Sequence, residues 1–174
     1  DNFSWNTSFV YSHTKTEISK LFNQGTVFDM ISGIGFAKQG YPVRAIFSIP
    51  FVGLNNEGLP QFINEKGEIT THNINFQERD KTDFLKYEGP SDPVYSGSLS
   101  NVFNYKGFHL NIFMTYAFGN VVRLNPVFRG TYTDLSSMTN IFKNRWMNPG
   151  DENSTNVPAI LSYRQVKENY ELTY

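Results

Sequence analysis

The chain of 174 residues contains no cysteine and no excess of basic residues, since 15 Lys and Arg stand against 16 Asp and Glu. The first absence excludes disulfides and Cys-ligated metal sites, and the second gives no support for a nucleic-acid partner. No run of about 20 apolar residues occurs, which argues against a helical membrane protein. The first segment also lacks the basic start and apolar core of a signal peptide, so we expect the chain to begin after processing or inside a longer polypeptide.

Catalytic and metal-binding motifs are missing as well. The three histidines, at positions 13, 72 and 109, are too far apart to suggest a metal site. Gly33-Ile34-Gly35 lacks the third glycine of a phosphate-binding fingerprint. The acidic segment 64–68 has Lys66 in its middle and too few oxygen ligands for a Ca²⁺ loop, so it predicts a turn. We therefore predict no enzyme, no metal and no cofactor.

What the sequence does have is 16% aromatic residues at a mean hydropathy of only -0.41. This combination is typical of strands that alternate between lipid-facing and water-facing side chains. Alternation predicts strands at about 2–15, 94–105 and 107–119, with a tight hairpin turn at Lys106-Gly107. The run from Phe3 to Tyr11, tilted by about 40°, covers roughly 20 Å, close to the apolar band of an outer-membrane barrel.

The alternation assigns side chains to two faces. The residues predicted to face lipid are Phe3, Trp5, Phe9, Phe108, Leu110, Ile112, Met114 and Tyr116. Two aromatic rims are expected, one from Phe3, Trp5, Tyr105 and Phe108 and the other from Tyr11, Tyr95, Tyr116 and Phe118. The lumen-facing candidates for contact with substrate or a plug are Asn2, Asn6, Asn104, His109 and Asn111. Contact with lumen water alone is the plainer alternative for these polar groups.

Two long excursions, 16–93 and 120–174, are expected to form extracellular loops, because short turns at one end and long loops at the other are typical of such barrels. A loop this long should carry structure or function of its own. We expect a small hairpin around 65–67, an extended segment over 41–52, a short amphipathic helix over 134–142 and a turn at 148–151.

Five loop aromatics are candidates for contact with cargo or with a covering lid. They are Tyr41, Phe47, Tyr132, Trp146 and Tyr163. Packing among the loops themselves is the alternative for all of them, and it is favoured for Trp146. Asp151 and Glu152 adjoin a Pro-Gly turn, where solvation or contact with a partner loop is expected.

An ordered set of short motifs carries a resemblance to a known family. They are GYPV at 40–43, FVGL at 51–54, YEGPSDP at 87–93, FNYKGF at 103–108, FGN at 118–120, RLNP at 123–126, NRW at 144–146 and PGDE at 149–152. In this order and spacing the chain resembles the later half of the barrel in the SusC/RagA family of TonB-dependent outer-membrane transporters of Bacteroidetes.

The resemblance implies an all-β chain that forms a segment of a transmembrane antiparallel barrel of about 22 strands, with long extracellular loops and one short helix in a loop. It also implies import of oligosaccharides or peptides across the outer membrane. The implied partners are the rest of the transporter, a SusD-like surface lipoprotein, TonB acting through the plug part, and outer-membrane lipid. The chain departs from a whole family member in having no plug, no TonB-interacting segment and no closing strands. We expect it to be a split, nicked or partial piece that ends in an extracellular loop.

Two other readings compete with the importer. A secreted or surface carbohydrate-binding β-sandwich would also be rich in Asn and aromatic residues, but its strands should be shorter, with turns every 8 to 12 residues. A surface-adhesion or assembly module depends on the loops alone. Folding as a monomer in plain buffer would exclude the barrel.

Overall fold

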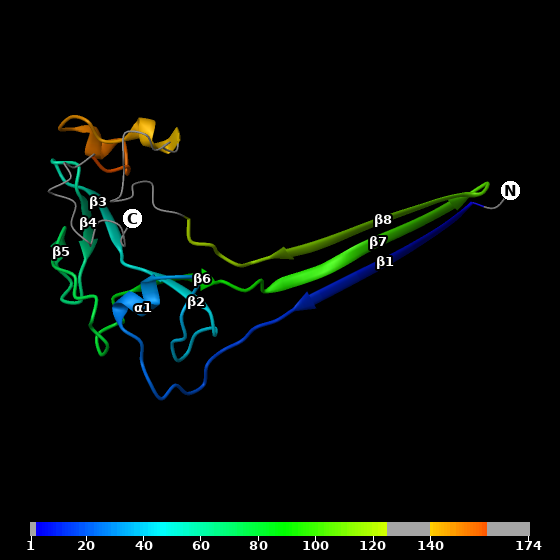
Figure 1. Cartoon of the computed structure of the whole chain (residues 1–174), viewed down its shortest axis with the longest axis horizontal. Helices are drawn as coiled ribbons and strands as arrows, with labels where there is room; N and C mark the ends of the chain where they lie inside the picture. The colour runs from blue at the N-terminus through cyan, green and yellow to red at the C-terminus, as the bar shows by residue number, and fades with distance from the viewer. Residues whose placement is uncertain (1–2, 125–139, 160–174) are drawn as a thin grey trace.

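The computed structural model describes residues 3–124 and 140–159, and it has two visibly different parts (Figure 1). Three long strands extend from a body built by the loops. The turn between the last two strands lies at the end of the sheet farthest from the loop body (Figure 1). This arrangement follows from the sequence, because one connection is two residues long and the others are very long.

The long sheet contains β1 (Ser4–His13), β7 (Tyr95–Tyr105) and β8 (Phe108–Phe118), in the order β1-β7-β8 with both pairs antiparallel. Its pairing runs without a bulge from end to end. Lys106 and Gly107 both have positive φ, 47° and 83°, as a two-residue hairpin turn requires. The three strands expected from alternation are thus present, each shorter than predicted by one or two residues at one or both ends.

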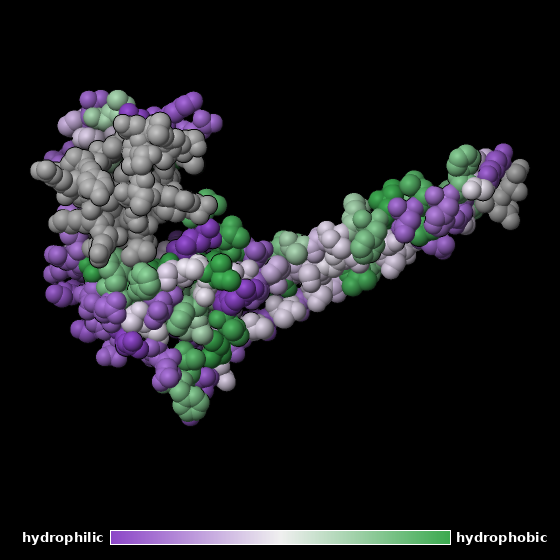
Figure 2. Space-filling model, viewed as in Figure 1, coloured by the Kyte–Doolittle hydropathy of each residue, from purple (hydrophilic) through white to green (hydrophobic). Residues whose placement is uncertain are grey.

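The register places the alternating sets of all three strands in common faces. Trp5 lies opposite Phe103, which lies opposite Leu110. One face is therefore apolar across the sheet, and the other carries mainly Ser, Asn and Thr. None of the three strands contains an Asp, Glu, Lys or Arg residue. In Figure 2 strongly hydrophilic residues gather over the loop body, whereas the middle of the sheet is pale to green.

Aromatic rings gather at both ends of the apolar face. Near the turn, Trp5 stacks on Phe103 with 5.8 Å between ring centroids. Near the loops, Tyr95 stacks on Phe118 and on His13, each at 4.9 Å. The four rings expected near the loops are therefore in contact, with His13 as an additional member. Near the turn only Phe3 and Trp5 of the expected rings are in contact, both through Phe103, which was not expected.

One row of the apolar face is polar. The Asn101 Oδ1 accepts hydrogen bonds from Trp5 Nε1 at 3.0 Å and from Thr7 Oγ1 at 2.8 Å. Two donors and one acceptor on this face thus satisfy one another.

The loop body has its own strands and helix: α1 (Val27–Ile31), β2 (Ala45–Ser48), β3 (Phe51–Leu54), β4 (Pro60–Ile63), β5 (Ile69–Thr70) and β6 (Lys86–Pro90). Strand β2 pairs with β6, and β3, β4 and β5 form a second small antiparallel sheet. Their buried side chains form one core: Val27, Met30, Ile31, Ala45, Phe47, Ile49, Phe62, Ile74 and Leu85. The first long excursion is therefore a packed unit.

Several local expectations can be compared with this body. The hairpin around 65–67 is confirmed, since Ile63 pairs with Ile69. The buried Asn64 closes its turn by accepting from the amides of Lys66 and Glu68. The segment 41–52 is extended in part, because only Ala45–Ser48 and the residues from Phe51 onward are strand.

The structure places helices differently from the sequence prediction. The expected helix over 134–142 lies mostly outside the described residues, and Asn140–Asn144 forms a 3₁₀ helix, η1. A second 3₁₀ helix, η2, covers Asp151–Asn153 directly after the predicted turn at 148–151, which is present. The unpredicted α1 begins with a capping box between Thr26 and Asp29.

No helix among the described residues is long and apolar enough to cross a membrane. The described strands form three open antiparallel sheets, none of which closes on itself. The architecture shown is therefore antiparallel β with few helices.

Candidate functional site

Polar side chains meet on the polar face of the long sheet. Asn104 donates from Nδ2 to Ser4 Oγ at 3.0 Å, and its Oδ1 lies 2.5 Å from His109 Nδ1. Ser100 Oγ donates to Asn111 Oδ1 at 3.5 Å. Three of the residues predicted to face the lumen, Asn104, His109 and Asn111, thus each make a side-chain contact with a neighbouring strand. Asn6 shares this face opposite Val102, and Asn2 lies outside the described residues.

A concave site lies where the long sheet meets the loop body. It is a cleft of about 630 Å³, within the range of ligand pockets. Three segments line it: the end of β1 with the residues after it, the turn before β2, and the end of β6 with the residues after it. The lining residues are His13, Thr14, Lys15, Thr16, Glu17, Gly40, Tyr41, Pro42, Tyr87, Pro90, Asp92, Pro93 and Val94.

Backbone hydrogen bonds hold one wall of the cleft at two points. The Thr14 amide donates to the Val94 carbonyl at 2.9 Å, and the Ile18 amide donates to the Tyr41 carbonyl at 3.0 Å. Between these points, the backbone of residues 15–17 makes no hydrogen bond within the described part of the chain. Its donors and acceptors remain available to a ligand.

Two tyrosines form the aromatic part of the cleft. The rings of Tyr41 and Tyr87 lie 4.9 Å apart, and each also packs on the buried ring of Phe47. Burial, and secondly the neighbouring Tyr41, raise the pKa of the Tyr87 hydroxyl. The Tyr87 side chain is therefore neutral at ordinary pH and presents a ring with a hydroxyl group.

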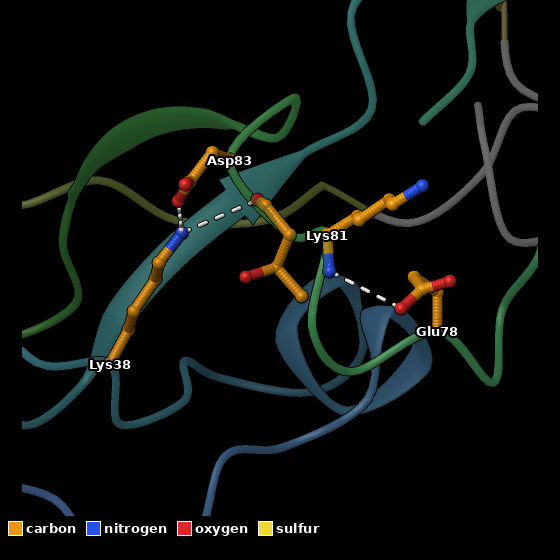
Figure 3. Close-up of polar contacts among 5 residues, drawn as sticks. Lys38, Glu78, Lys81 and Asp83 are labelled. Atoms are coloured by element: carbon orange, nitrogen blue, oxygen red, sulfur yellow. Dashed lines mark hydrogen bonds and ion pairs between the residues drawn. The ribbon is translucent and has the colours of Figure 1, made fainter. Parts of the chain in front are cut away.

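The side chain of Lys38 packs against the rings of Tyr41 and Phe47. Its ammonium group lies 5.7 Å from the ring centroid of Tyr41 and 5.6 Å from that of Phe47. Figure 3 shows it held by Asp83, at 2.9 Å, and it also donates to the carbonyl of Thr82 at 3.3 Å. On the adjoining turn, also drawn in Figure 3, the amide of Lys81 donates to Glu78 at 3.2 Å.

The YEGPSDP segment joins the cleft to the long sheet. Asp92 forms an ion pair with Arg44, and the Ser91 amide donates to the Arg44 carbonyl at 2.8 Å. Gly89 has a φ of 148° and lies against Val121, so a side chain there would be strained and crowded. Strand β6 is thus clamped between β2 and the chain that leaves β8.

Charged side chains also gather around the β2–β6 pair. Glu88 accepts from Ser48 Oγ at 2.6 Å and pairs with Lys86 at 3.1 Å. The hydrogen bond from Ser48 is the main cause that lowers the pKa of Glu88. Arg123 donates to the Phe47 carbonyl at 2.7 Å, and partial burial lowers its pKa while Glu88 opposes that change. These contacts are internal and offer no obvious ligand site.

The five loop aromatics have different positions. Tyr41 lines the cleft. Phe47 has 0% of its surface exposed, so the expectation that it contacts lid or cargo is wrong: its ring fills the core beneath Tyr41. Trp146 packs over Gly58 and donates from Nε1 to Glu152 at 2.9 Å, in line with the favoured packing among loops. Tyr132 and Tyr163 lie outside the described residues.

Asp151 and Glu152 stabilise their own turn. Asp151 accepts from the amides of Asn148 and Met147, and these two bonds lower the pKa of its carboxyl group. The bond from Trp146 is the largest cause that lowers the pKa of Glu152. The solvation expected for these carboxylates is therefore replaced in part by hydrogen bonds within the loop.

Sequence reasoning missed most of the cleft. Tyr87 and Asp92 belong to the YEGPSDP segment, which was noted only for the resemblance. Thr16 and Glu17 lie three and four residues after the end of β1, in the part of a loop where sites are often shaped. No cluster of His, Asp or Glu that could hold a metal ion occurs among the described residues. No family model matches the chain, and no curated protein matches it either.

Proposed function

We propose that this chain forms part of the wall and outer mouth of a TonB-dependent importer of the SusC/RagA type, in the bacterial outer membrane. Strands β1, β7 and β8 lie in the wall, their apolar face toward lipid and their polar face toward the lumen. The loop body faces the cell exterior, where it meets cargo and a SusD-like lipoprotein. The chain's role is positional, and none of its residues carries out a reaction.

The observation that carries this proposal is the charge-free sheet with an uncovered apolar face. Phe9 and Leu110 on this face have 64% and 55% of their surface exposed, although the loop body buries residues of the same kind. An 11-residue strand tilted by about 40° covers roughly 25 Å, the height of the apolar band in an outer-membrane barrel. Lipid is the solvent in which such a face is favourable.

The uncovered apolar face also argues against the alternative, a carbohydrate-binding β-sandwich. A sandwich needs a second sheet packed about 10 Å from the apolar face. Within residues 3–124 and 140–159, the small sheets of the loop body lie beyond the end of this face and do not cover it (Figure 1).

Spin labels on neighbouring residues test which face meets lipid. The chain has no cysteine, so Met114→Cys on the apolar face and Thr115→Cys on the polar face each give one attachment point. In outer-membrane vesicles we expect the label at 114 to be relaxed more by oxygen, which concentrates in lipid. We expect the label at 115 to be relaxed more by a water-soluble nickel chelate. Equal access of the chelate to both labels would contradict the proposal, as would a folded monomer in plain buffer.

A further inference from the structure

The cleft begins at the residue where the apolar face ends. His13 is the last residue of β1, stacks on Tyr95 in the rim near the loops, and also lines the cleft. A ligand in the cleft therefore touches the aromatic rim near the loops on one side and the loop body on the other. The cleft is therefore distinct from both the polar face of the sheet and the core of the loop body.

The charges of the lining disfavour a strongly ionic ligand. The carboxylates of Glu17 and Asp92 stand against Lys15, and Asp92 is already paired with Arg44. A phosphate group would need a surplus of cationic donors, and an ammonium ligand would need a surplus of carboxylates or a cage of ring faces. The lining supplies neither, so it suits a neutral molecule.

The available hydrogen-bonding groups are numerous and mixed. Thr16 and Glu17 make no side-chain hydrogen bond within the described part of the chain, and the backbone of residues 15–17 is also unpaired there. Opposite them, Tyr41 and Tyr87 supply rings, with Pro42, Pro90 and Pro93 beside them. A sugar ring presents hydroxyl groups at its edge and C–H groups on its faces, so it matches both walls.

A peptide strand matches the cleft less well. The unpaired backbone spans only three residues between the fixed points at Thr14 and Ile18. Strand addition depends on a row of main-chain hydrogen bonds, and the three prolines opposite have no amide hydrogen to contribute.

From these observations we infer that the cleft binds a neutral saccharide, with its hydroxyl groups on Thr16, Glu17 and the backbone of residues 15–17, and a ring face on the tyrosines. The position at the outer rim rests on the proposed function, but the binding itself requires no transport. Two sources present the same chemistry at this height: a soluble oligosaccharide on its way to the lumen, and the sugar head group of a lipid whose chains lie on the apolar face.

Binding is measured on the full chain in detergent micelles. Neutral oligosaccharides are screened on an array, and the best binder is titrated by calorimetry. A lipid that carries the same sugar is tested in nanodiscs, and a pool of mixed-sequence peptides is tested in parallel. Glu17→Gln removes the negative charge and one of the two acceptor oxygens, and Thr16→Val removes a hydroxyl group, whereas Glu57→Gln changes an exposed carboxylate outside the cleft and serves as the matched control.

We expect Glu17→Gln to weaken saccharide binding roughly tenfold, because a hydrogen bond to a charged carboxylate is replaced by a weaker one to a neutral amide, and Glu57→Gln to leave it unchanged. Binding of the soluble sugar supports a cargo site, and binding of only the lipid-linked sugar supports a head-group site. Binding of peptides alone, binding of nothing, or equal loss in Glu17→Gln and Glu57→Gln overturns the inference. Each of these results leaves the spin-label test of the sheet faces intact, so the two proposals fail separately.

Discussion

At the scale of single residues, Gly97 and Tyr116 hold the three strands together near the loops. Gly97 lies between Tyr11 and Tyr116 in the register, and the Tyr116 hydroxyl crosses it to donate to the Val10 carbonyl at 2.9 Å. A Cβ at position 97 would overlap both the Val10 carbonyl oxygen and the Tyr116 hydroxyl. The glycine is needed for space, since the tyrosine covers it.

We therefore expect Gly97→Ala to destabilise the sheet by about 1–3 kcal/mol, the usual cost of overpacking. Tyr116→Phe, which keeps the ring and loses one hydrogen bond, should cost about 1 kcal/mol. Thermal unfolding in detergent, followed by circular dichroism, measures both. Ser98→Ala on the opposite face is the control, and an equal effect of Ser98→Ala and Gly97→Ala would show that the crossing tyrosine has no special role.

Lys38 is the second residue whose role separates into parts. Its side chain is mostly buried over Tyr41 and Phe47, whereas its partner Asp83 is almost fully exposed. We expect Lys38→Met to destabilise the loop body by about 1–2 kcal/mol through lost contacts with the rings and with Thr82. Asp83→Asn should cost less than about 1 kcal/mol, because an exposed ion pair contributes little.

The fluorescence of Trp146 in a Trp5→Phe background reports unfolding of the loop body alone, since the chain has only these two tryptophans. Equal losses in Lys38→Met and Asp83→Asn would mean that the contact with the rings adds nothing to the ion pair.

At the scale of elements, acid should act on the loop body and spare the long sheet. Five carboxylates in the loops have pKa values below their ordinary range, and strands β1, β7 and β8 contain no carboxylate. The five are Asp29, Glu78, Glu88, Asp151 and Glu152. Hydrogen bonds are the largest cause in each case, as in the bond from the amide of Lys81 to Glu78.

The sign of the effect follows from these lowered pKa values. Each carboxylate contributes stability that is fully present above its ordinary pKa, 3.8 for Asp or 4.5 for Glu, and that is lost as the pH falls through the lowered folded-state value. In the Trp5→Phe background, the melting temperature reported by Trp146 should therefore decrease as the pH is lowered below about 4.5. The amide circular dichroism of the long strands should change less. Simultaneous loss of both signals would contradict the separation.

The same division explains what the sequence could predict at this scale. Strands β1, β7 and β8 are long, and most of their side chains alternate between apolar and polar, so their period identifies both the strands and their faces. Helix α1 has five residues, too few to show a helical period, and only its Thr26-Asp29 capping box marked it. The cleft could not be predicted for another reason. Glu17, Tyr41 and Asp92 are brought together by pairing between segments more than 20 residues apart.

At the scale of the whole molecule, the proposed function requires that the two faces of one strand meet different solvents. Ile112 and Asn111 are neighbours near the middle of β8, and they point to opposite faces. If the apolar face meets lipid, Ile112→Arg places a charge near the bilayer midplane, which costs about 2–4 kcal/mol. Asn111→Arg places the same charge in the lumen, where the expected cost is below about 0.5 kcal/mol.

The fraction of protein that is inserted and resistant to protease in outer-membrane vesicles measures this difference, and urea titration of the inserted protein gives its size. We expect Ile112→Arg to lower the inserted fraction strongly and Asn111→Arg to leave it near that of the parent chain. Because the two substitutions add the same side chain one residue apart, strand propensity and net charge cancel in the comparison. If both variants inserted equally well, the apolar face would not meet lipid, and its rings would have to be covered by protein.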